Sequence, residues 1–393
     1  MGDNDAPLLL DVSRLVWRRW SGTRATGIDR ICLAWLEHYG PRSQAVIVHR
    51  RGQAILPFGT SQALFRLLSR PDRKRADTTA FRASLTALAI RRSGHLRDSL
   101  DGRGRIWLNA GHTGLDSPRV VRWARQRHLR LVPLVHDLIP ITHPQYCRPG
   151  EDDRHRQRMR TALDLAVGIV TNSNDTLAAL GTFAKAEERV VPRSLAVWPG
   201  TPLQQYVSAF EPAEPVFVVV GTIEGRKNHA LLLSIWRRLI DSSHKQPVPK
   251  LVLVGRRGWQ AEAVIAQLES NSFGDRVTEL GPLDDDRLAC LLAGARALLF
   301  PSFAEGFGIP LVEALAAGVP VIASDLSVFR EIGQGVPELL SVSEPLAWQE
   351  AILDYANPNS LRRAKQLRRI AAFTPYGWQD HFKQIDDFLS KLE

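Results

Sequence analysis

The sequence predicts an α/β protein made of two parallel-sheet domains, each covered by helices. Short runs of β-branched and apolar residues alternate with longer amphipathic segments, which is the pattern of parallel strands joined by helices. This alternation occurs in both halves of the chain. Because 393 residues exceed what one hydrophobic core usually holds, two domains of roughly 150 to 200 residues each are expected.

Each expected strand is an apolar run that ends at glycine or polar residues. A last helix over residues 376–392 carries five large apolar side chains at helical spacing on one face: Trp378, Phe382, Ile385, Phe388 and Leu389. Residues 201–215 are rich in proline and polar residues and lack helical periodicity, so they are expected to link domain 1–200 to domain 216–372. The expected strands are residues 7–15, 44–50, 105–110, 130–137 and 166–173 in the first half, and 215–221, 250–255, 297–302 and 319–324 in the second.

The two halves differ in charge. Residues 1–200 contain 32 Lys and Arg against 18 Asp and Glu, a balance of +14, whereas residues 201–393 contain 19 against 23, a balance of −4. A basic half indicates an anionic partner, such as a membrane surface or a phosphorylated acceptor. Nucleic acid is not expected, because aromatic residues are not interleaved with the arginines and no zinc-finger or RNP-type pattern occurs.

Composition also indicates the compartment. No apolar run approaches the roughly 18 to 20 residues that a membrane-spanning helix needs, and the first residues are acidic rather than basic, so a cytoplasmic protein is expected. The cysteines Cys32, Cys147 and Cys290 are widely spaced, which favours reduced core thiols over a disulfide framework or a zinc site.

One segment that follows an expected strand is a candidate binding site, because ligands of open α/β sheets bind where the strands end. Glu305 and Glu313 flank the sequence Gly-Phe-Gly-Ile-Pro, in which Pro310 suits the start of a helix, and Gly318 suits the position after its end. Backbone N–H groups at a helix start bind anions or sugar hydroxyls, and paired carboxylates accept hydrogen bonds from a vicinal diol. The segment therefore predicts a polyhydroxylated ligand: a nucleotide, a sugar or both.

The segment EGFGIPLVE, residues 305–313, resembles the E-x7-E signature of retaining GT-B glycosyltransferases, in particular glycosyltransferase family 4. The segment VGTIEGRKNHALLL, residues 220–233, is similar to the part of that family that follows the first strand of the nucleotide-binding domain. The resemblance implies the GT-B architecture: two Rossmann-like domains that face a central cleft, with residues 373–393 as a helix crossing back to the first domain. Other segments resemble landmarks of bacterial members that build surface polysaccharides, namely residues 26–30, 108–116, 135–150, 171–173, 253–259 and 279–288.

The resemblance also implies roles in donor binding. Glu305 would hold hydroxyls of the donor sugar, Glu313 the ribose, and Lys227 the departing diphosphate, on which negative charge grows in the transition state. Many relatives carry Arg directly after the glycine that ends the strand, where this chain has Thr222; either Arg226 supplies the second cation or phosphate binding is weaker. The other implied donor-binding residues are Gly27, Arg256, Gly281, Gly306, Phe307, Gly308 and Ile309.

His136 and Asp137, at the end of the run 130–137, are the implied catalytic residues of the first domain, beside Glu305 and Lys227. The resemblance places such a histidine against the donor sugar. His136 would then help to stabilise positive charge as the glycosidic bond breaks, and Asp137 would orient it. His112 is a further, weaker candidate.

The implied activity is transfer of a hexose from a nucleotide-diphosphate sugar to a lipid-linked or growing surface glycan, with retention of the anomeric configuration. GDP-mannose is the preferred donor, a polyprenyl diphosphate-linked glycan is the implied acceptor, and neither a metal ion nor a bound cofactor is expected. A retaining phosphorylase or hydrolase acting on a sugar chain stays open, as does a non-catalytic subunit that binds sugar nucleotides. Dehydrogenases and P-loop enzymes are excluded, because neither the G-x-G-x-x-G nor the Walker A pattern occurs after a strand.

The basic segment of residues 64–97 mixes leucines, among them Leu64 and Leu68, with many arginines. Amphipathic basic segments of this kind lie in interfaces that carry anionic lipid, and they also occur as solvated helical faces. Peripheral contact with the inner face of the membrane is therefore expected as one of these two alternatives.

Overall fold

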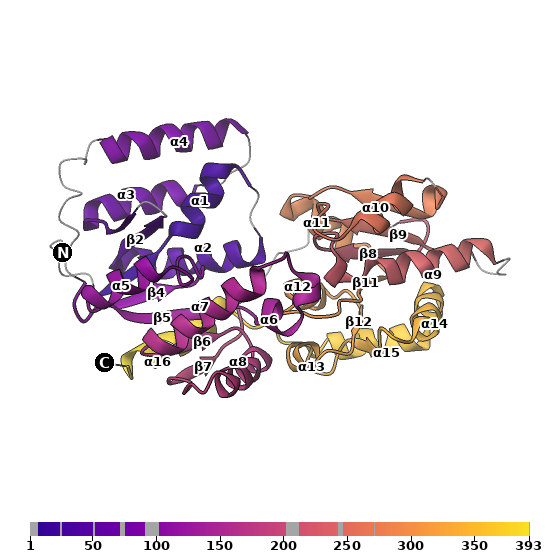
Figure 1. Cartoon of the computed structure of the whole chain (residues 1–393). Helices are drawn as coiled ribbons and strands as arrows, with labels where there is room; N and C mark the ends of the chain where they lie inside the picture. Colours follow the sequence, from indigo (N-terminus) through magenta and orange to yellow (C-terminus); the bar gives the residue numbers. More distant parts are fainter. Residues whose placement is uncertain are drawn as a thin grey trace. The chain divides into compact units, whose positions relative to one another are not determined.

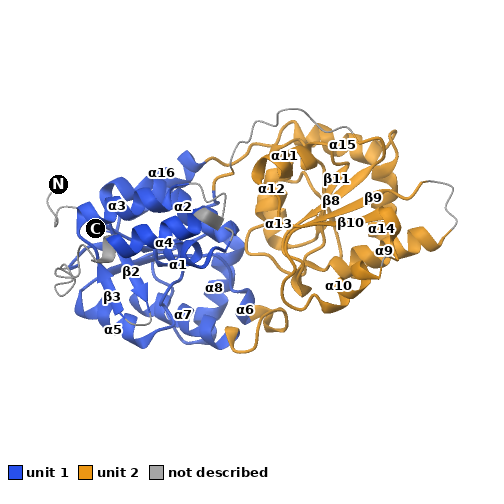
Figure 2. Cartoon of the chain, turned by 90° about the horizontal axis from the view of Figure 1, so that it is seen from above, with its two compact units in different colours: residues 1–141, 152–199, 378–393 blue, residues 142–151, 200–377 orange. Residues whose placement is uncertain are grey.

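The computed structural model describes residues 7–23, 26–49, 52–70, 75–90, 102–201, 212–242, 247–270 and 272–392. The chain forms two compact units, shown in different colours in Figure 2. Unit 1 contains residues 1–141, 152–199 and 378–393, and unit 2 contains residues 142–151 and 200–377. Each unit is built on a largely parallel sheet with helices around it, so the predicted two-sheet α/β fold is confirmed (Figure 1).

The sheet of unit 1 has the strand order β3-β2-β1-β4-β5-β6-β7, and all neighbours are parallel except β2 and β3. β3 and β7 were not expected from the sequence. β3 pairs antiparallel because only residues 50–51 separate it from β2 in the sequence, and a parallel return needs a much longer crossover. The strands are β1 (Leu8–Asp11), β2 (Ser43–His49), β3 (Gly52–Ile55), β4 (Ile106–Asn109), β5 (Arg130–Val135), β6 (Ile169–Thr171) and β7 (Ser194–Ala196).

Helices connect these strands. β1 is followed by two helices, of which α1 packs against α2, α3 and α4. The helices that connect the strands of this unit are α1 (Ser13–Ser21), α2 (Gly27–Tyr39), α3 (Phe58–Leu68), α4 (Arg75–Ile90), α5 (Pro118–Gln126), α6 (Ile139–Thr142), α7 (Glu151–Leu165) and α8 (Asn174–Ala186), with short 3-10 turns η1 (Gly40–Arg42) and η2 (Pro144–Tyr146).

The last helix, α16 (Trp378–Ser390), belongs to unit 1. Its predicted apolar face is buried at Phe382, Ile385, Phe388 and Leu389. The helix packs on α2, where the ring of His38 stacks on Phe382 with centroids 4.0 Å apart. At the same contact Trp35 Nε1 donates a hydrogen bond to His381 Nε2 over 3.1 Å. The apolar face of this last helix is thus buried in the core of unit 1, against α2.

The sheet of unit 2 has the order β10-β9-β8-β11-β12-β13 and is parallel throughout. β10 and β13 were not expected. The strands are β8 (Val216–Val220), β9 (Lys250–Val254), β10 (Val277–Leu280), β11 (Ala297–Phe300), β12 (Val321–Ser324) and β13 (Glu338–Leu340). The helices are α9 (His229–Asp241), α10 (Glu262–Glu269), α11 (Asp285–Ala293), α12 (Ile309–Ala316), α13 (Ser327–Ile332), α14 (Pro345–Ala356) and α15 (Leu361–Ile370), with η3 (Gly225–Lys227) and η4 (Gly274–Arg276).

The central strands of both sheets are buried on both faces, as parallel strands covered by helices must be. Every residue of β1, β4, β11 and β12 is buried. In unit 2 the core includes Trp236 and Trp348, which are fully buried and whose indole N–H groups donate to the backbone oxygens of Pro249 and Ser341. The polar atoms of these large side chains are therefore satisfied inside the core.

Two expectations about single residues are wrong. Leu64 and Leu68 are core residues of α3, with 1% and 4% of their surface exposed, so they are not free to enter a lipid surface. Of the three cysteines, all free thiols, only Cys32 is buried, whereas Cys290 is exposed.

None of the helices in the described part of the chain is both long and apolar enough to cross a bilayer.

Candidate functional site

The candidate donor site lies at the carboxyl edge of the sheet in unit 2. β8 and β11 are hydrogen-bonded neighbours, so the segments that follow them start at the same edge. After β8 the chain passes through Gly221 into η3, which carries Arg226 and Lys227. After β11 it runs through Glu305 into α12.

The backbone around Glu305 is shaped by glycine. Gly308 is the N-cap of α12 with a φ of 105°, a conformation that other residues rarely adopt. A β-carbon at this position would also lie 2.6 Å from the ring of Phe329. Pro310 stands in the first turn of α12, and Gly318, just after the helix, has a φ of 76°. The helix start and stop predicted from the sequence are therefore confirmed.

Glu305 lies at the centre of a cluster of charges. Its side chain is 8% exposed and pairs with Lys227 Nζ at 2.5 Å and with Arg226 Nη1 at 2.9 Å. Ser302 Oγ donates a further hydrogen bond to Glu305 Oε1 at 2.7 Å. Arg226 also pairs with Glu224 at 2.8 Å and donates to the backbone oxygen of Ala304 at 2.5 Å. The two loops are thereby tied together through one carboxylate.

The cluster keeps Glu305 ionised. Burial alone would raise the pKa of this carboxyl group, but the charges of Arg226 and Lys227 and the hydrogen bonds from Lys227 and Ser302 outweigh it and hold the pKa at about 2. Burial lowers the pKa of the Lys227 ammonium below its usual value, against the attraction of Glu305. The ammonium also lies 4.7 Å from the ring centroid of Phe300.

The other predicted donor residues follow the same edge. Thr222 and Arg256 are the second residues after β8 and β9, Gly281 directly follows β10, and Glu313 lies half-buried on α12. Arg256 and Gly281 are exposed. Within the described part of the chain, no hydrogen bond or ion pair joins the side chain of Thr222 or Arg256 to Glu305, whereas Arg226, considered as the substitute for an arginine at position 222, pairs with it.

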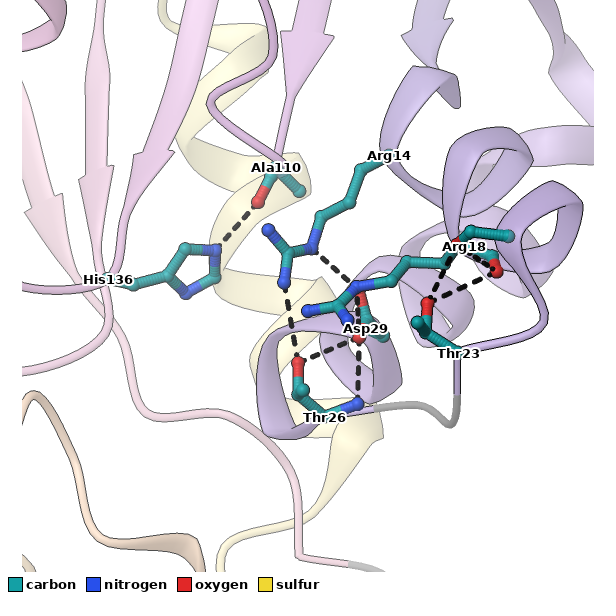
Figure 3. A network of polar contacts seen from close by, with 8 residues as sticks. Arg14, Arg18, Thr23, Thr26, Asp29, Ala110 and His136 are labelled. Atoms are coloured by element: carbon teal, nitrogen blue, oxygen red, sulfur yellow. Dashed lines mark hydrogen bonds and ion pairs between the residues drawn. The ribbon is translucent and has the colours of Figure 1, made fainter. Parts of the chain in front are cut away.

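Unit 1 carries a second polar cluster, at the carboxyl edge of its own sheet (Figure 3). Asp29, in the first turn of α2, is 2% exposed and pairs with Arg14 at 2.6 Å and Arg18 at 3.3 Å. It also accepts hydrogen bonds from the backbone N–H and the hydroxyl of Thr26, both at 2.7 Å. Gly27, the predicted site residue, is the first residue of this helix.

His136 directly follows β5 and is 4% exposed. Its Nε2 donates to the backbone oxygen of Ala110 at 2.6 Å, whereas its buried Nδ1 has no partner among the described residues (Figure 3). Burial lowers the pKa of His136, with a smaller contribution of the same sign from Arg14. The His136 ring is therefore neutral, and its unprotonated Nδ1 can accept a hydrogen bond.

Asp137 does not orient His136 as expected. Its Oδ1 accepts a hydrogen bond from the backbone N–H of Ile139 at 3.0 Å, and its backbone oxygen accepts from His155 Nε2 at 3.0 Å. Ala110 orients the His136 ring instead. A backbone oxygen also orients His112, because its Nε2 donates to the backbone oxygen of Leu134 at 2.6 Å. The ring centroid of His112 lies 5.2 Å from that of His136.

Sequence reasoning missed Ser302 in unit 2 and Arg14, Arg18 and Asp29 in unit 1. A local signal existed for Asp29, because Thr26 and Asp29 have the spacing of a capping box at the start of α2. No local signal marks Arg14, because its partner Asp29 lies 15 residues away in the next helix. Ser302 lies only three residues before its partner Glu305, and the resemblance gave it no role.

Comparisons with known proteins agree with this architecture. Residues 203–363 match the family described as Glycosyl transferases group 1. Over 264 residues the chain is 28% identical to the O-antigen chain mannosyltransferase B of Escherichia coli, a match that covers 64% of this chain and 68% of that one. Over 140 residues it is 41% identical to the O-antigen chain mannosyltransferase RfbU of Salmonella typhimurium, which covers 35% of this chain and 38% of that one.

Solved structures show the same fold. The HepE protein of Anabaena, in complex with UDP and glucose, matches with a TM-score of 0.67 at 16% identity over 98% of this chain and 99% of that one. The sucrose-phosphate synthase of Thermosynechococcus elongatus matches with a TM-score of 0.60 at 16% identity over 98% of both chains. The two parallel-sheet units thus have the GT-B fold.

Asp11, the last residue of β1, is a buried acid near the unit 1 cluster. Burial raises its pKa from 3.8 to about 7, against hydrogen bonds from Ser13. An unfolded chain loses this proton near pH 4 and the folded chain near pH 7, so the group makes folding less favourable as the pH rises through this range.

Asp11→Asn removes this titration. The free energy of unfolding of the variant, relative to the unmodified chain, should rise by about 2 to 4 kcal/mol between pH 4 and pH 8. Urea unfolding at both pH values measures the difference. The same relative stability at both pH values would contradict a raised pKa for Asp11.

Proposed function

We propose that this protein is a glycosyltransferase that moves a hexose from a nucleotide-diphosphate sugar to a hydroxyl of a growing surface glycan and retains the anomeric configuration. The observation that carries the proposal is the cluster of Glu305, Lys227 and Arg226 at the carboxyl edge of unit 2. It lies inside the segment that matches the group 1 glycosyl transferases. The names of the similar O-antigen mannosyltransferases support a surface glycan as product and mannose as the sugar.

The chemistry of the cluster suits a donor with both hydroxyls and phosphates. An ionised Glu305 accepts hydrogen bonds from sugar hydroxyls more strongly than a neutral group does. Lys227 and Arg226 stabilise negative charge on the leaving diphosphate, and the backbone N–H groups of Gly306, Phe307 and Gly308 lie at the start of α12, where an anion is favoured. Glu313, one helical turn into α12, is assigned to the ribose.

His136 suits the sugar side of this reaction as a neutral base. Its Nδ1 can accept a hydrogen bond from a sugar hydroxyl, and its lone pair is compatible with positive charge that develops as the glycosidic bond breaks. A protonated ring would oppose that charge. The lowered pKa of His136 keeps the ring neutral at physiological pH.

A panel of nucleotide sugars tests the proposal. GDP-mannose is the proposed donor, and UDP-hexoses are the comparison. The protein should release the free nucleotide only when a lipid-linked glycan acceptor is present, and the product should keep the donor's anomeric configuration by NMR. Donor cleavage without an acceptor would indicate a hydrolase, release of a sugar phosphate would indicate a phosphorylase, and binding without turnover would indicate a non-catalytic subunit.

The two carboxylates are expected to act differently. Glu305→Gln keeps the shape but removes the charge, so in a chain that still folds kcat should fall about 100-fold, because the hydroxyls lose a charged acceptor. Glu313→Gln should mainly raise the KM for the nucleotide sugar. Steady-state kinetics of both variants measures the split, and full activity of Glu305→Gln would contradict its assignment.

Metal-independent transfer is part of the proposal, since two cationic side chains and a helix start neutralise the diphosphate. Activity should therefore persist in EDTA, measured as nucleotide release before and after chelation. A complete loss that Mg²⁺ or Mn²⁺ restores would contradict this mechanism.

Peripheral membrane contact is proposed for unit 1, at α1 and α4 rather than at α3. Trp17 and Trp20 of α1 are 60% and 36% exposed, and Arg82 of α4 lies 5.6 Å from the Trp20 ring centroid. Tryptophan and arginine side chains favour the interface of an anionic bilayer. The basic residues Arg73 and Lys74, between the two helices α3 and α4, lie outside the described residues.

Vesicle co-sedimentation measures this contact. Binding should occur with anionic but not with neutral vesicles, should weaken at high salt, and should decrease several-fold in a Trp17→Ser, Trp20→Ser variant. Replacing Arg70, Arg73, Lys74 and Arg75 by Ser should also weaken it. Trp259→Ser, at an exposed tryptophan of unit 2, is the matched control. Equal recovery in the supernatant with both kinds of vesicle would refute membrane contact.

A further inference from the structure

One short segment belongs to unit 2 although the residues before and after it belong to unit 1. Residues 142–151 leave unit 1 after Ile141 and return to it at Asp152, and they are drawn in the colour of unit 2 in Figure 2. The segment contains η2 and starts five positions after Asp137. Its contacts within unit 2 involve the segments that follow β9 and β11.

One of these contacts is an aromatic stack. The ring of Tyr146 lies nearly parallel to that of Phe303, with the centroids 5.2 Å apart and the planes 7° from each other. Phe303 stands two residues before Glu305, in the loop that follows β11. The backbone N–H of Phe303 also donates to the backbone oxygen of Arg226 at 2.9 Å. Tyr146 therefore packs on the residue that joins the two loops of the Glu305 cluster.

A second set of contacts involves Trp259 and Gln260, in the segment between β9 and α10. Gln260 Nε2 donates to the backbone oxygen of Gln145 at 2.8 Å, and the Arg148 guanidinium lies 5.8 Å from the ring centroid of Trp259. The backbone oxygen of Trp259 in turn accepts from the N–H of Gly225, the first residue of η3. The segment is thus connected to the Glu305 loop through Phe303 and, indirectly through Trp259 and Gly225, to the loop of Lys227.

We propose that Tyr146 is a positioning residue for Glu305. Its ring fixes Phe303 from one side, which limits the motion of the loop that carries the carboxylate between Lys227 and Arg226. A flat ring is required for this role, and the hydroxyl is not, because the contact is made face to face. The consequence for catalysis rests on the proposed role of Glu305 in donor binding, whereas the effect on the loop does not.

Hydrogen–deuterium exchange of residues 301–308 tests the effect on the loop. In Tyr146→Leu the amide of Phe303 should exchange about tenfold faster, while Tyr146→Phe should stay within twofold of the unmodified chain. Gln145→Leu is the matched control, since it changes an exposed side chain of the same segment and keeps the backbone oxygen. Unchanged exchange in Tyr146→Leu, with the variant folded by circular dichroism, would overturn the proposal.

A double-mutant cycle tests the effect on catalysis. Tyr146→Leu should lower kcat/KM for GDP-mannose, or for whichever nucleotide sugar the panel identifies, by about fivefold, but by less than twofold in a Glu305→Gln background. Equal losses in both backgrounds would mean that Tyr146 does not act through Glu305 and would overturn the positioning role. Absence of turnover in the unmodified chain would instead refute the proposed function, and the exchange experiment would still decide the role of Tyr146.

Discussion

The electrostatics of unit 2 depend on one buried carboxylate. A charged Glu305 at 8% exposure is unfavourable without partners, and it has two cations and a hydroxyl within hydrogen-bonding distance. Those cations follow β8 and the carboxylate follows β11, so the cluster forms only because the two strands are neighbours in the sheet. The ionised state of Glu305 therefore depends on the order of the strands in the sheet, because that order brings its cationic partners next to it.

The same pairing means that the cations are already compensated before any ligand binds. Arg226 contacts both Glu224 and Glu305, and Lys227 contacts Glu305. An entering diphosphate would compete with these carboxylates for the cations, and Glu305 would exchange part of its contact with them for sugar hydroxyls. Two loops and the start of α12 hold these partners in place, and preorganised charge of this kind is the condition for electrostatic stabilisation of the transition state in the proposed reaction.

The carboxyl edge of the sheet in unit 1 carries two buried histidines and an arginine–aspartate cluster. His112 and His136 donate their Nε2 protons to backbone oxygens, and burial lowers the pKa of both rings. The positive charge there resides on Arg14 and Arg18, which Asp29 holds at the start of α2. The rings next to the edge are thus neutral, and the cations beside them are paired with Asp29.

The sequence by itself determined the fold class and the parts of the site that are local. Apolar runs predicted the central strands, and Pro310 and Gly318 predicted the start and the end of α12, because glycine and proline act through their own backbone conformations. The spacing of Glu305 and Glu313 indicated a polyhydroxylated ligand, and Arg226 was already considered as the second cation. The edge strands β3, β7, β10 and β13 were missed because they are short or only partly buried and so lack a strong apolar run.

Only the tertiary structure decided which groups meet. Lys227 meets Glu305 because β8 and β11 are neighbours, and Ala110 orients His136 because β4 and β5 are neighbours. No local pattern encodes such distances. Leu64 and Leu68 were expected at a surface and are core residues, since an amphipathic helix looks the same whether its apolar face meets lipid or a neighbouring helix. Burial, which sets the protonation of His136 and Asp11, is likewise a property of the packed chain, because desolvation depends on every atom around a group rather than on its neighbours in sequence.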